Sequence, residues 1–219
     1  MCIRDRDYEL LRTVPSALSG TATGVGYSRD VTTLLALAQY IRNLGYQAYA
    51  SMNDTALSIP MAIQAGLGEY GRHGLLITKE FGPRVRIGKV FTDLPLAHDK
   101  PIQFGVEKFC NICRECTKAC PPGAIDDGNQ LETIYNQSNI PGIAKWTTDA
   151  EKCFDFWVKQ VTDCSICIRV CPYNRKMPKW AFKTWTNLMA TPFKRIILWL
   201  DKIIGQGKRN APSNWWKGH

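Results

Sequence analysis

Histidine is scarce in this sequence: three of its 219 residues are histidine. Neither His-Glu-x-x-His, nor a P-loop, nor Gly-x-Ser-x-Gly occurs, so the usual sequence signals of zinc proteases, P-loop nucleotide hydrolases and serine hydrolases are absent. Hydrolase chemistry therefore has no support in the sequence. We expect His73, His98 and His219 to be surface residues.

Long apolar runs are absent as well. The longest candidate, Ile196 to Ile204, is broken by Asp201 and Lys202 and is shorter than the roughly 20 residues that a membrane-spanning helix needs. The opening residues, MCIRDR, lack the apolar stretch and cleavage site of a signal peptide. Because they lead directly into sequence that looks structured, we expect the chain to be the later part of a longer protein.

Acidic residues are nearly missing from the last part of the chain. Residues 172–219 hold ten of the 28 Lys and Arg residues, five of the seven tryptophans and one acid, Asp201. Basic residues interleaved with aromatics can bind nucleic acid or an anionic membrane surface. Tryptophan is more often core or interface material, and a charge run is usually a solvated face. We therefore favour a segment that wraps the fold, and expect no nucleic-acid partner.

Cysteine, by contrast, is abundant and grouped. Eight of the nine cysteines form two runs, C-x2-C-x2-C-x3-C-P within residues 110–121 and C-x10-C-x2-C-x3-C-P within residues 153–172. This spacing is typical of proteins that hold two [4Fe-4S] clusters. The short-spaced cysteines of each run supply three ligands, so the fourth has to come from elsewhere.

In the bacterial two-cluster pattern, the last cysteine of each run is a ligand of the other cluster. We therefore assign to the first cluster Cys110, Cys113, Cys116 and Cys171. The second cluster then takes Cys120, Cys153, Cys164 and Cys167. The remaining cysteine, Cys2, is interpreted as an incidental thiol.

Zinc and disulfides are weaker interpretations of these cysteines. Zinc sites favour paired C-x2-C elements, often with histidine, whereas here a third cysteine follows at the same interval. Disulfide frameworks belong to short secreted chains with distributed cysteines. Two clusters form an electron-transfer path, which implies a place where the electrons do chemistry. The residues before the first run are the candidate for that place.

Those residues alternate between helical and strand patterns. We predict a helix over 29–44 with Ser28 as its cap, and a helix over 58–65 with a proline in its first turn. Strands are predicted over 47–51, 75–78 and 85–92. The stretch 128–142 is turn-rich and indicates an insertion loop. A tail helix is expected to carry an apolar face that needs a partner, formed by Phe193, Ile196, Ile197, Leu200, Ile203 and Ile204.

The sequence Gly66-x-Gly68-x-x-Gly71 has the letters of a dinucleotide-binding fingerprint. That fingerprint requires a strand before the glycines and a helix after them, whereas here a helix is predicted before and a strand after. We interpret these glycines as positions of positive φ, or of close backbone approach to something bulky.

The chain as a whole resembles the corrinoid-dependent reductive dehalogenases. The resemblance is carried by SALSG (16–20), GYSR (26–29), YIRNLGY (40–46), Asn53, SIP (58–60), AGLGE (65–69), GLLIT (74–78), FGPRVR (81–86) and TDLPL (92–96), by both cysteine runs, and by GQG (205–207) and WW (215–216) in the tail. It implies an α+β fold with a nitroreductase-like α/β core for a base-off cobamide, a two-[4Fe-4S] bacterial-ferredoxin-like domain and a helical tail. We expect a partial core over 1–104, the cluster domain over 105–175 and a basic, Trp-rich wrapping segment over 176–219.

The resemblance also implies the reaction, which is reductive cleavage of a carbon–halogen bond at a cobamide cobalt fed by two [4Fe-4S] clusters. Tyr27 matches the family's proton-donating tyrosine, Arg86 the cation beside it, and Asn53 an asparagine that positions substrate. An adjacent cation steadies the phenolate left after proton transfer. A base-off corrinoid needs no histidine ligand. The predicted corrinoid contacts are Gly26, Ser58, Gly66 and Gly68.

By the same resemblance, the partners are an organohalide substrate, an electron donor and a small membrane-anchor subunit. The protein would be exported and peripherally attached to the outer face of the cytoplasmic membrane, with a cytoplasmic location as the alternative. Family members normally carry a long N-terminal region, often with a twin-arginine signal, and neither is in this sequence. We expect activity to require that missing part.

Two other functions stay open from sequence. Epoxyqueuosine reductase, a tRNA-modifying relative, shares the cobalamin core and the pair of clusters, but its resemblance centres on an aspartate proton donor. A non-catalytic electron-transfer module would need the clusters and no corrinoid, so corrinoid binding by the full-length protein would separate it from both enzymes.

Overall fold

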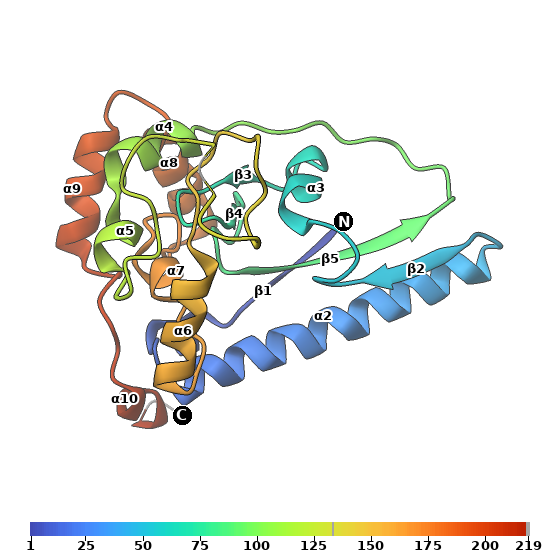
Figure 1. The fold of residues 1–219 in the computed structure, drawn as a ribbon, viewed down its shortest axis with the longest axis horizontal. Helices are drawn as coiled ribbons and strands as arrows, with labels where there is room; N and C mark the ends of the chain where they lie inside the picture. Colours follow the sequence, from blue (N-terminus) through green and yellow to red (C-terminus); the bar gives the residue numbers. More distant parts are fainter. Residues whose placement is uncertain (133, 218–219) are drawn as a thin grey trace.

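A three-stranded antiparallel sheet organises the first part of the chain. The computed structural model describes residues 1–132 and 134–217. Its central strand is β5 (Val85–Thr92), which pairs with β1 (Cys2–Asp5) on one edge and with β2 (Ala48–Ser51) on the other. Figure 1 shows this sheet beside the long helix α2, with the cysteine-bearing helices gathered at one end.

Helix α2 (Ala17–Asn43) begins earlier than predicted. Its N-cap is Ser16, whose side chain accepts from Ser19 N in a reciprocal capping box. The predicted start at Ser28 is wrong, because the Ser28 hydroxyl lies inside the helix and donates to Gly24 O at 3.2 Å. Gly20, in the first turn of the helix, has a packing reason: a Cβ there would lie 2.8 Å from Thr162 Oγ1.

Helix α2 packs against β5 at Gly88. A Cβ at Gly88 would lie 2.6 Å from Leu34 Cδ1 and 2.9 Å from Asp30 Oδ1, both on α2, so these side chains would have to shift to admit a larger residue. This packing brings Tyr27, one turn before Asp30, against Arg86, two residues before Gly88.

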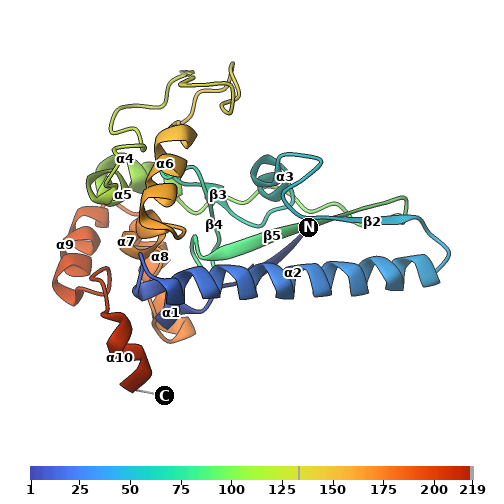
Figure 2. The ribbon, with the colours of Figure 1, turned by 60° about the horizontal axis from the view of Figure 1, so that its bottom comes forward.

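The remaining predicted elements of this part are confirmed with small shifts at their ends. Helix α3 (Ser58–Gln64) precedes the three glycines, and the two-stranded sheet of β3 (Glu69–Tyr70) and β4 (Leu76–Ile77) follows. A short helix α1 (Tyr8–Arg12) precedes α2. In Figure 2, α2 and α3 lie on opposite sides of the three-stranded sheet.

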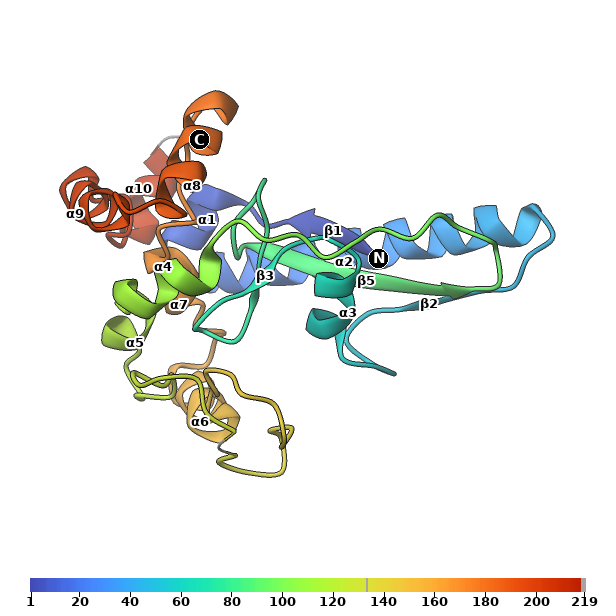
Figure 3. The ribbon, with the colours of Figure 1, turned by 90° about the horizontal axis from the view of Figure 1, so that it is seen from above.

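The cysteine-bearing part is built from short helices. They are α4 (Val106–Cys113), α5 (Glu115–Ala119), α6 (Ala150–Gln160) and α7 (Ile166–Val170). Glu69 stabilises the start of α4, because its carboxylate accepts hydrogen bonds from Phe104 N at 2.5 Å and from Val106 N at 3.2 Å. The predicted insertion loop carries no helix or strand in its described residues, and it projects beside α6 in Figure 3.

The tail forms three helices, α8 (Lys179–Met189), α9 (Lys194–Ile204) and α10 (Pro212–Lys217), although only the middle one was predicted. The expected apolar face of α9 is only partly covered. Ile197 is buried, whereas Phe193, Ile196 and Ile203 are exposed. No helix within the described residues combines the length and apolarity that a membrane crossing requires.

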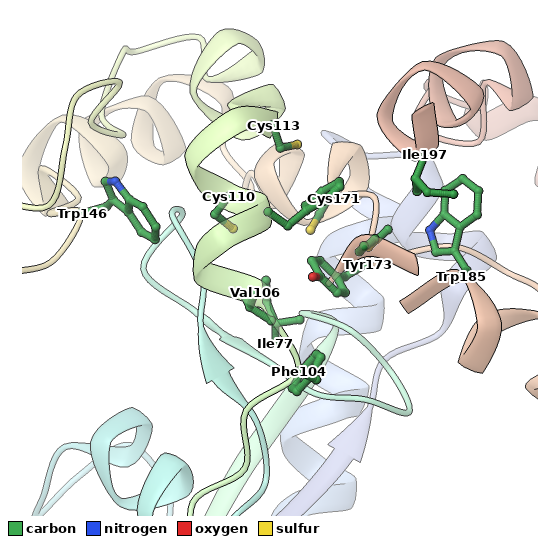
Figure 4. Close-up of a cluster of buried hydrophobic side chains, with 12 residues drawn as sticks. Ile77, Phe104, Val106, Cys110, Cys113, Trp146, Cys171, Tyr173, Trp185 and Ile197 are labelled. Carbon is green, nitrogen blue, oxygen red and sulfur yellow. The ribbon is translucent and has the colours of Figure 1, made fainter. Parts of the chain in front are cut away.

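Polar contacts of Asp201 and Arg209 are among those that fix the tail to the rest of the chain. Arg175 and Asp201 form a buried bidentate ion pair, with Nε–Oδ1 at 2.5 Å and Nη2–Oδ2 at 2.7 Å. Arg209 donates to the main-chain oxygens of Thr13 and Pro15. The largest buried cluster draws on all three predicted segments, from Ile77 through Val106 to Trp185 (Figure 4).

We predict that Asp201→Ala lowers the free energy of unfolding by about 3–5 kcal/mol, because it leaves the buried Arg175 guanidinium without its partner. The loss is measured by denaturant unfolding under anaerobic conditions. The matched control is Asp155→Ala, which breaks the exposed Lys159–Asp155 pair and should cost at most about 1 kcal/mol. Equal losses in the two variants would contradict the prediction.

Candidate functional site

Three predicted residues meet at one phenol oxygen. Tyr27 comes from α2, Arg86 from β5, and Asn53 from the loop after β2. Asn53 Nδ2 donates to Tyr27 Oη at 2.8 Å, and Arg86 Nη1 donates to the same oxygen at 3.1 Å. The Arg86 guanidinium carbon also lies 3.9 Å from the Tyr27 ring centroid. Two donors at one oxygen, one of them a cation, stabilise negative charge on it.

Asp30 is a buried acidic group near this trio. It lies on α2 one turn after Tyr27 and is almost fully buried. Burial raises the pKa of Asp30, while the nearby Arg86 and Arg4 act in the opposite direction. Asp54, next to Asn53 in the sequence, is exposed.

Arg6 connects the trio to the second cysteine run, and no sequence pattern pointed to it. It is 3% exposed, and its Nη1 donates to Thr23 Oγ1 at 3.0 Å and to Ser165 Oγ at 3.3 Å. Thr23 in turn donates to Asp163 Oδ2 at 2.8 Å. Burial lowers the pKa of Arg6 to about 10, and Arg86 acts in the same direction. This network ties α2 to the loop that carries Cys164.

A cavity of about 1940 Å³ joins the trio to the cysteines. Tyr27, Asn53, Arg86 and Ser58 line it. Its wall also contains the whole group predicted for the second cluster, namely Cys120, Cys153, Cys164 and Cys167. One open space therefore reaches from the phenol to these thiols.

Three of the predicted corrinoid contacts face protein instead of this cavity. Gly66 has φ +69°, and a Cβ there would lie 2.6 Å from Lys100 O. A Cβ on Gly68 would lie 2.2 Å from Ile77 O, and one on Gly26 would lie 3.4 Å from Arg6 Cγ. Positive φ or close backbone approach was predicted for the 66–71 glycines. Gly66 has positive φ, and the close neighbour is the chain's own main chain at Gly66 and Gly68 but the side chains of His73 and Ile77 at Gly71. Ser58 alone of the four remains at the cavity.

Cysteines from the two runs lie together in the structure. Cys171, at the end of the second run, interacts with Cys110, Cys113 and Cys116 of the first, and Figure 4 shows it beside α4. Burial raises the pKa of Cys110 to about 12 and that of Cys116 to about 11. These four thiols are the ones predicted for the first cluster.

The second group also combines cysteines from both runs. Burial raises the pKa of Cys153 to about 11, with Cys164 and then Cys120 adding to the effect. Cys167 interacts with Cys116 of the first group and with all three members of its own group. In the described part of the chain, no group of three or more His, Cys, Asp or Glu residues is placed to hold a single metal ion. The cluster ligands remain a prediction that these groupings support.

Arg72 supplies positive charge beside the first group, a role that the sequence did not reveal. It is buried, and its Nη1 donates to Asp126 O at 2.8 Å and Gly128 O at 2.9 Å, while its guanidinium carbon lies 4.6 Å from the ring centroid of Trp146. Its charge opposes the effect of burial on the pKa of Cys110. Arg72 thus favours the ionised form that a metal cluster requires.

All three histidines were predicted to be surface residues, and for His73 this prediction is wrong. His98 is exposed as predicted, and His219 lies outside the described residues. His73 is buried, and burial lowers its pKa to about 4. The buried environment comes from the β3–β4 turn, where Leu75 N donates to His73 Nδ1 at 3.2 Å. His73 lines the cavity, and its buried Nε2 has no partner among the described residues.

Two family models match this chain. Residues 4–96 match the family model of the reductive dehalogenase subunit, and residues 109–174 match that of the 4Fe-4S double cluster binding domain. A tetrachloroethene reductive dehalogenase of Desulfitobacterium hafniense is 42% identical over 203 residues, which are 91% of this chain and 36% of that protein. The chain thus spans about a third of the length of the curated relatives it matches.

A solved reductive dehalogenase, described as suggesting a mechanism for B12-dependent dehalogenation, superimposes with a TM-score of 0.84 at 30% identity, covering 94% of this chain and 30% of that one. An epoxyqueuosine reductase of Lactococcus garvieae matches a shorter stretch, at 32% identity over 58% of this chain and 35% of that protein. The dehalogenase match covers the phenol, both cysteine runs and the tail. The chain belongs to the reductive dehalogenase family.

Proposed function

We propose that the protein to which this chain belongs reductively cleaves a carbon–halogen bond of an organohalide, using a cobamide and two [4Fe-4S] clusters. One observation carries the proposal: the Tyr27 oxygen, held by Asn53 and Arg86, lies on the same cavity as four cysteines of the second group. A proton donor and a source of electrons thus face one space. The epoxyqueuosine alternative has no comparable support in this site.

The cavity suits a large cofactor. Its volume is about twice the upper end of the ~300–1,000 Å³ of ordinary small-molecule sites. Ser58 and the loop before it would contact the cobamide. When bound, the cobamide supplies the reducing centre that breaks the carbon–halogen bond.

The chain's own residues handle the proton. Overall, the substrate takes up two electrons and one proton, and the halide leaves. Tyr27 gives its phenolic proton to the carbon that loses the halogen. Arg86 and Asn53 hold the phenolate oxygen with two hydrogen bonds, so that negative charge appears where donors already point.

The second group of cysteines would hold the cluster that faces the cavity. Its four members line that space, whereas none of the first group does. We therefore place the first cluster on the side of the electron donor. Arg72 beside the first group and Arg6 beside the second offset the negative charge that reduced clusters carry.

The finer architecture and the partners are part of this proposal. Residues 1–104 would supply part of a nitroreductase-like core, 105–175 the two-cluster domain and 176–219 the wrapping segment. By family resemblance the protein would be exported, attached to the outer face of the cytoplasmic membrane and bound to a small anchor subunit. The whole protein is required for activity in this scheme.

We predict that Tyr27→Phe in the full-length enzyme lowers the rate of halide release by about 10²–10⁴-fold, the usual contribution of a positioned general acid. The assay follows halide release from a halogenated phenol and from a chlorinated ethene. Tyr40→Phe is the matched control, because Tyr40 lies on the same helix and is 61% exposed. Undiminished halide release by Tyr27→Phe would remove Tyr27 as proton donor, and epoxyqueuosine turnover instead of halide release would select the tRNA-modifying relative.

We predict that Cys171→Ser removes about half of the bound iron and the same electron-paramagnetic signal that Cys113→Ser removes. The reason is that Cys171 lies with the first-run cysteines. Cys2→Ser serves as the control and should keep all of the iron. If Cys171→Ser removed the signal that Cys164→Ser removes, each run would ligate its own cluster and the crossed assignment would be wrong.

A further inference from the structure

The ammonium group of Lys89 lies buried under the loop that carries Asn53. Lys89 is in the middle of β5, three residues after Arg86, and is 1% exposed. Its Nζ donates to alternate residues of the loop, namely the main-chain oxygens of Met52, Asp54 (3.2 Å) and Ala56 (3.1 Å), and Ser58 Oγ (2.9 Å). An ammonium has three protons, so these four acceptors fully use its capacity to donate.

No carboxylate neutralises this charge. Lys89 forms no ion pair within residues 1–132 and 134–217, where its partners are the four oxygens named above. The acid of the loop, Asp54, instead accepts from Met52 N at 2.8 Å and from Ser51 Oγ at 3.2 Å. A buried cation without a counterion is stabilised by dipoles that point at it. The converging carbonyl groups and the ammonium therefore depend on each other.

The same loop forms one end of the candidate active site. Asn53 lies between Met52 and Asp54, whose carbonyl groups both bind Lys89, and it donates to Tyr27 Oη. Residues 55–58 line the cavity. Thr55 has φ +70°, a conformation that a β-branched residue rarely adopts. The bonds of Lys89 to the carbonyl groups on either side of Thr55 offset the cost of that conformation.

We propose that Lys89 is a positioning residue that holds loop 52–58, keeps Asn53 against Tyr27 and sets the wall of the cavity where substrate binds. Lys89 does not touch the phenol and acts through Asn53. The inference rests on the proposed roles of Tyr27 and Asn53, and it adds a residue from the opposite side of the loop.

The first test is hydrogen–deuterium exchange on the full-length enzyme loaded with cobamide and both clusters. In Lys89→Met, the amides of 52–58 should exchange about tenfold faster, as expected when roughly one hydrogen bond's stabilisation is lost, while those of α2 stay unchanged. Lys194→Met is the matched control, since it removes an ammonium–carbonyl bond to Lys108 O away from the cavity. Unchanged exchange of the loop in Lys89→Met would overturn the proposal.

The second test asks whether Lys89 acts through Asn53. Lys89→Met and Asn53→Ala should each lower kcat/KM for halide release by about tenfold, and the double variant should lose little more than either one. If the two losses multiplied instead, Lys89 would not act through Asn53.

Two further arms keep the outcome clear. Ser58→Ala removes one acceptor of the Lys89 ammonium and should speed exchange at the same amides by a smaller factor, so it replaces Lys89→Met if that variant does not fold. If the wild-type enzyme releases no halide, the proposed function is refuted. The role of Lys89 is still decided separately, because the exchange experiment shows whether Lys89 holds the loop.

Discussion

The mixing of the two cysteine runs is the constraint on which the rest of the structure depends. Because Cys171 lies with the first run and Cys120 with the second, neither group is complete until α4 and α5 meet α6 and α7. Thiols within a group repel one another once ionised, which favours a positively charged metal centre between them and explains Arg72 close to the first group. Glu69, in β3 of the two-stranded sheet, then binds the start of α4, and Arg6, just after β1 of the three-stranded sheet, binds the loop that carries Cys164.

Local sequence patterns correctly predicted those elements whose ends are determined by residues close in the sequence. The strand 85–92, the helix at 58 and the spacing of the cysteines belong to this class, and the family motifs pointed to Tyr27, Asn53 and Arg86 before their contacts were known. The start of α2 could not be predicted in this way, because Gly20 is explained by Thr162, far away along the chain. The same holds for Arg6, whose partner Ser165 is 159 positions distant.

The phenol oxygen of Tyr27 lies between two polar networks of different character. On one side, Arg6, Thr23 and Asp163 connect its helix to the second group of cysteines through side chains alone. On the other, Lys89 binds the Asn53 loop mainly through main-chain oxygens. Main-chain contacts constrain the path of the loop but do not depend on which side chains the loop carries. Cavity-lining side chains at Thr55 and Leu57 can therefore vary without loss of the Asn53 contact.

The packing of helix α2 on strand β5 has a consequence of another kind. Tyr27 lies on the helix and Arg86 on the strand, so neither needs a loop to bring it to the other. In the proposed reaction, the cavity wall can therefore change shape while the proposed proton donor and its cation keep their spacing. Under that proposal, selectivity for one organohalide over another can evolve in residues of the wall alone.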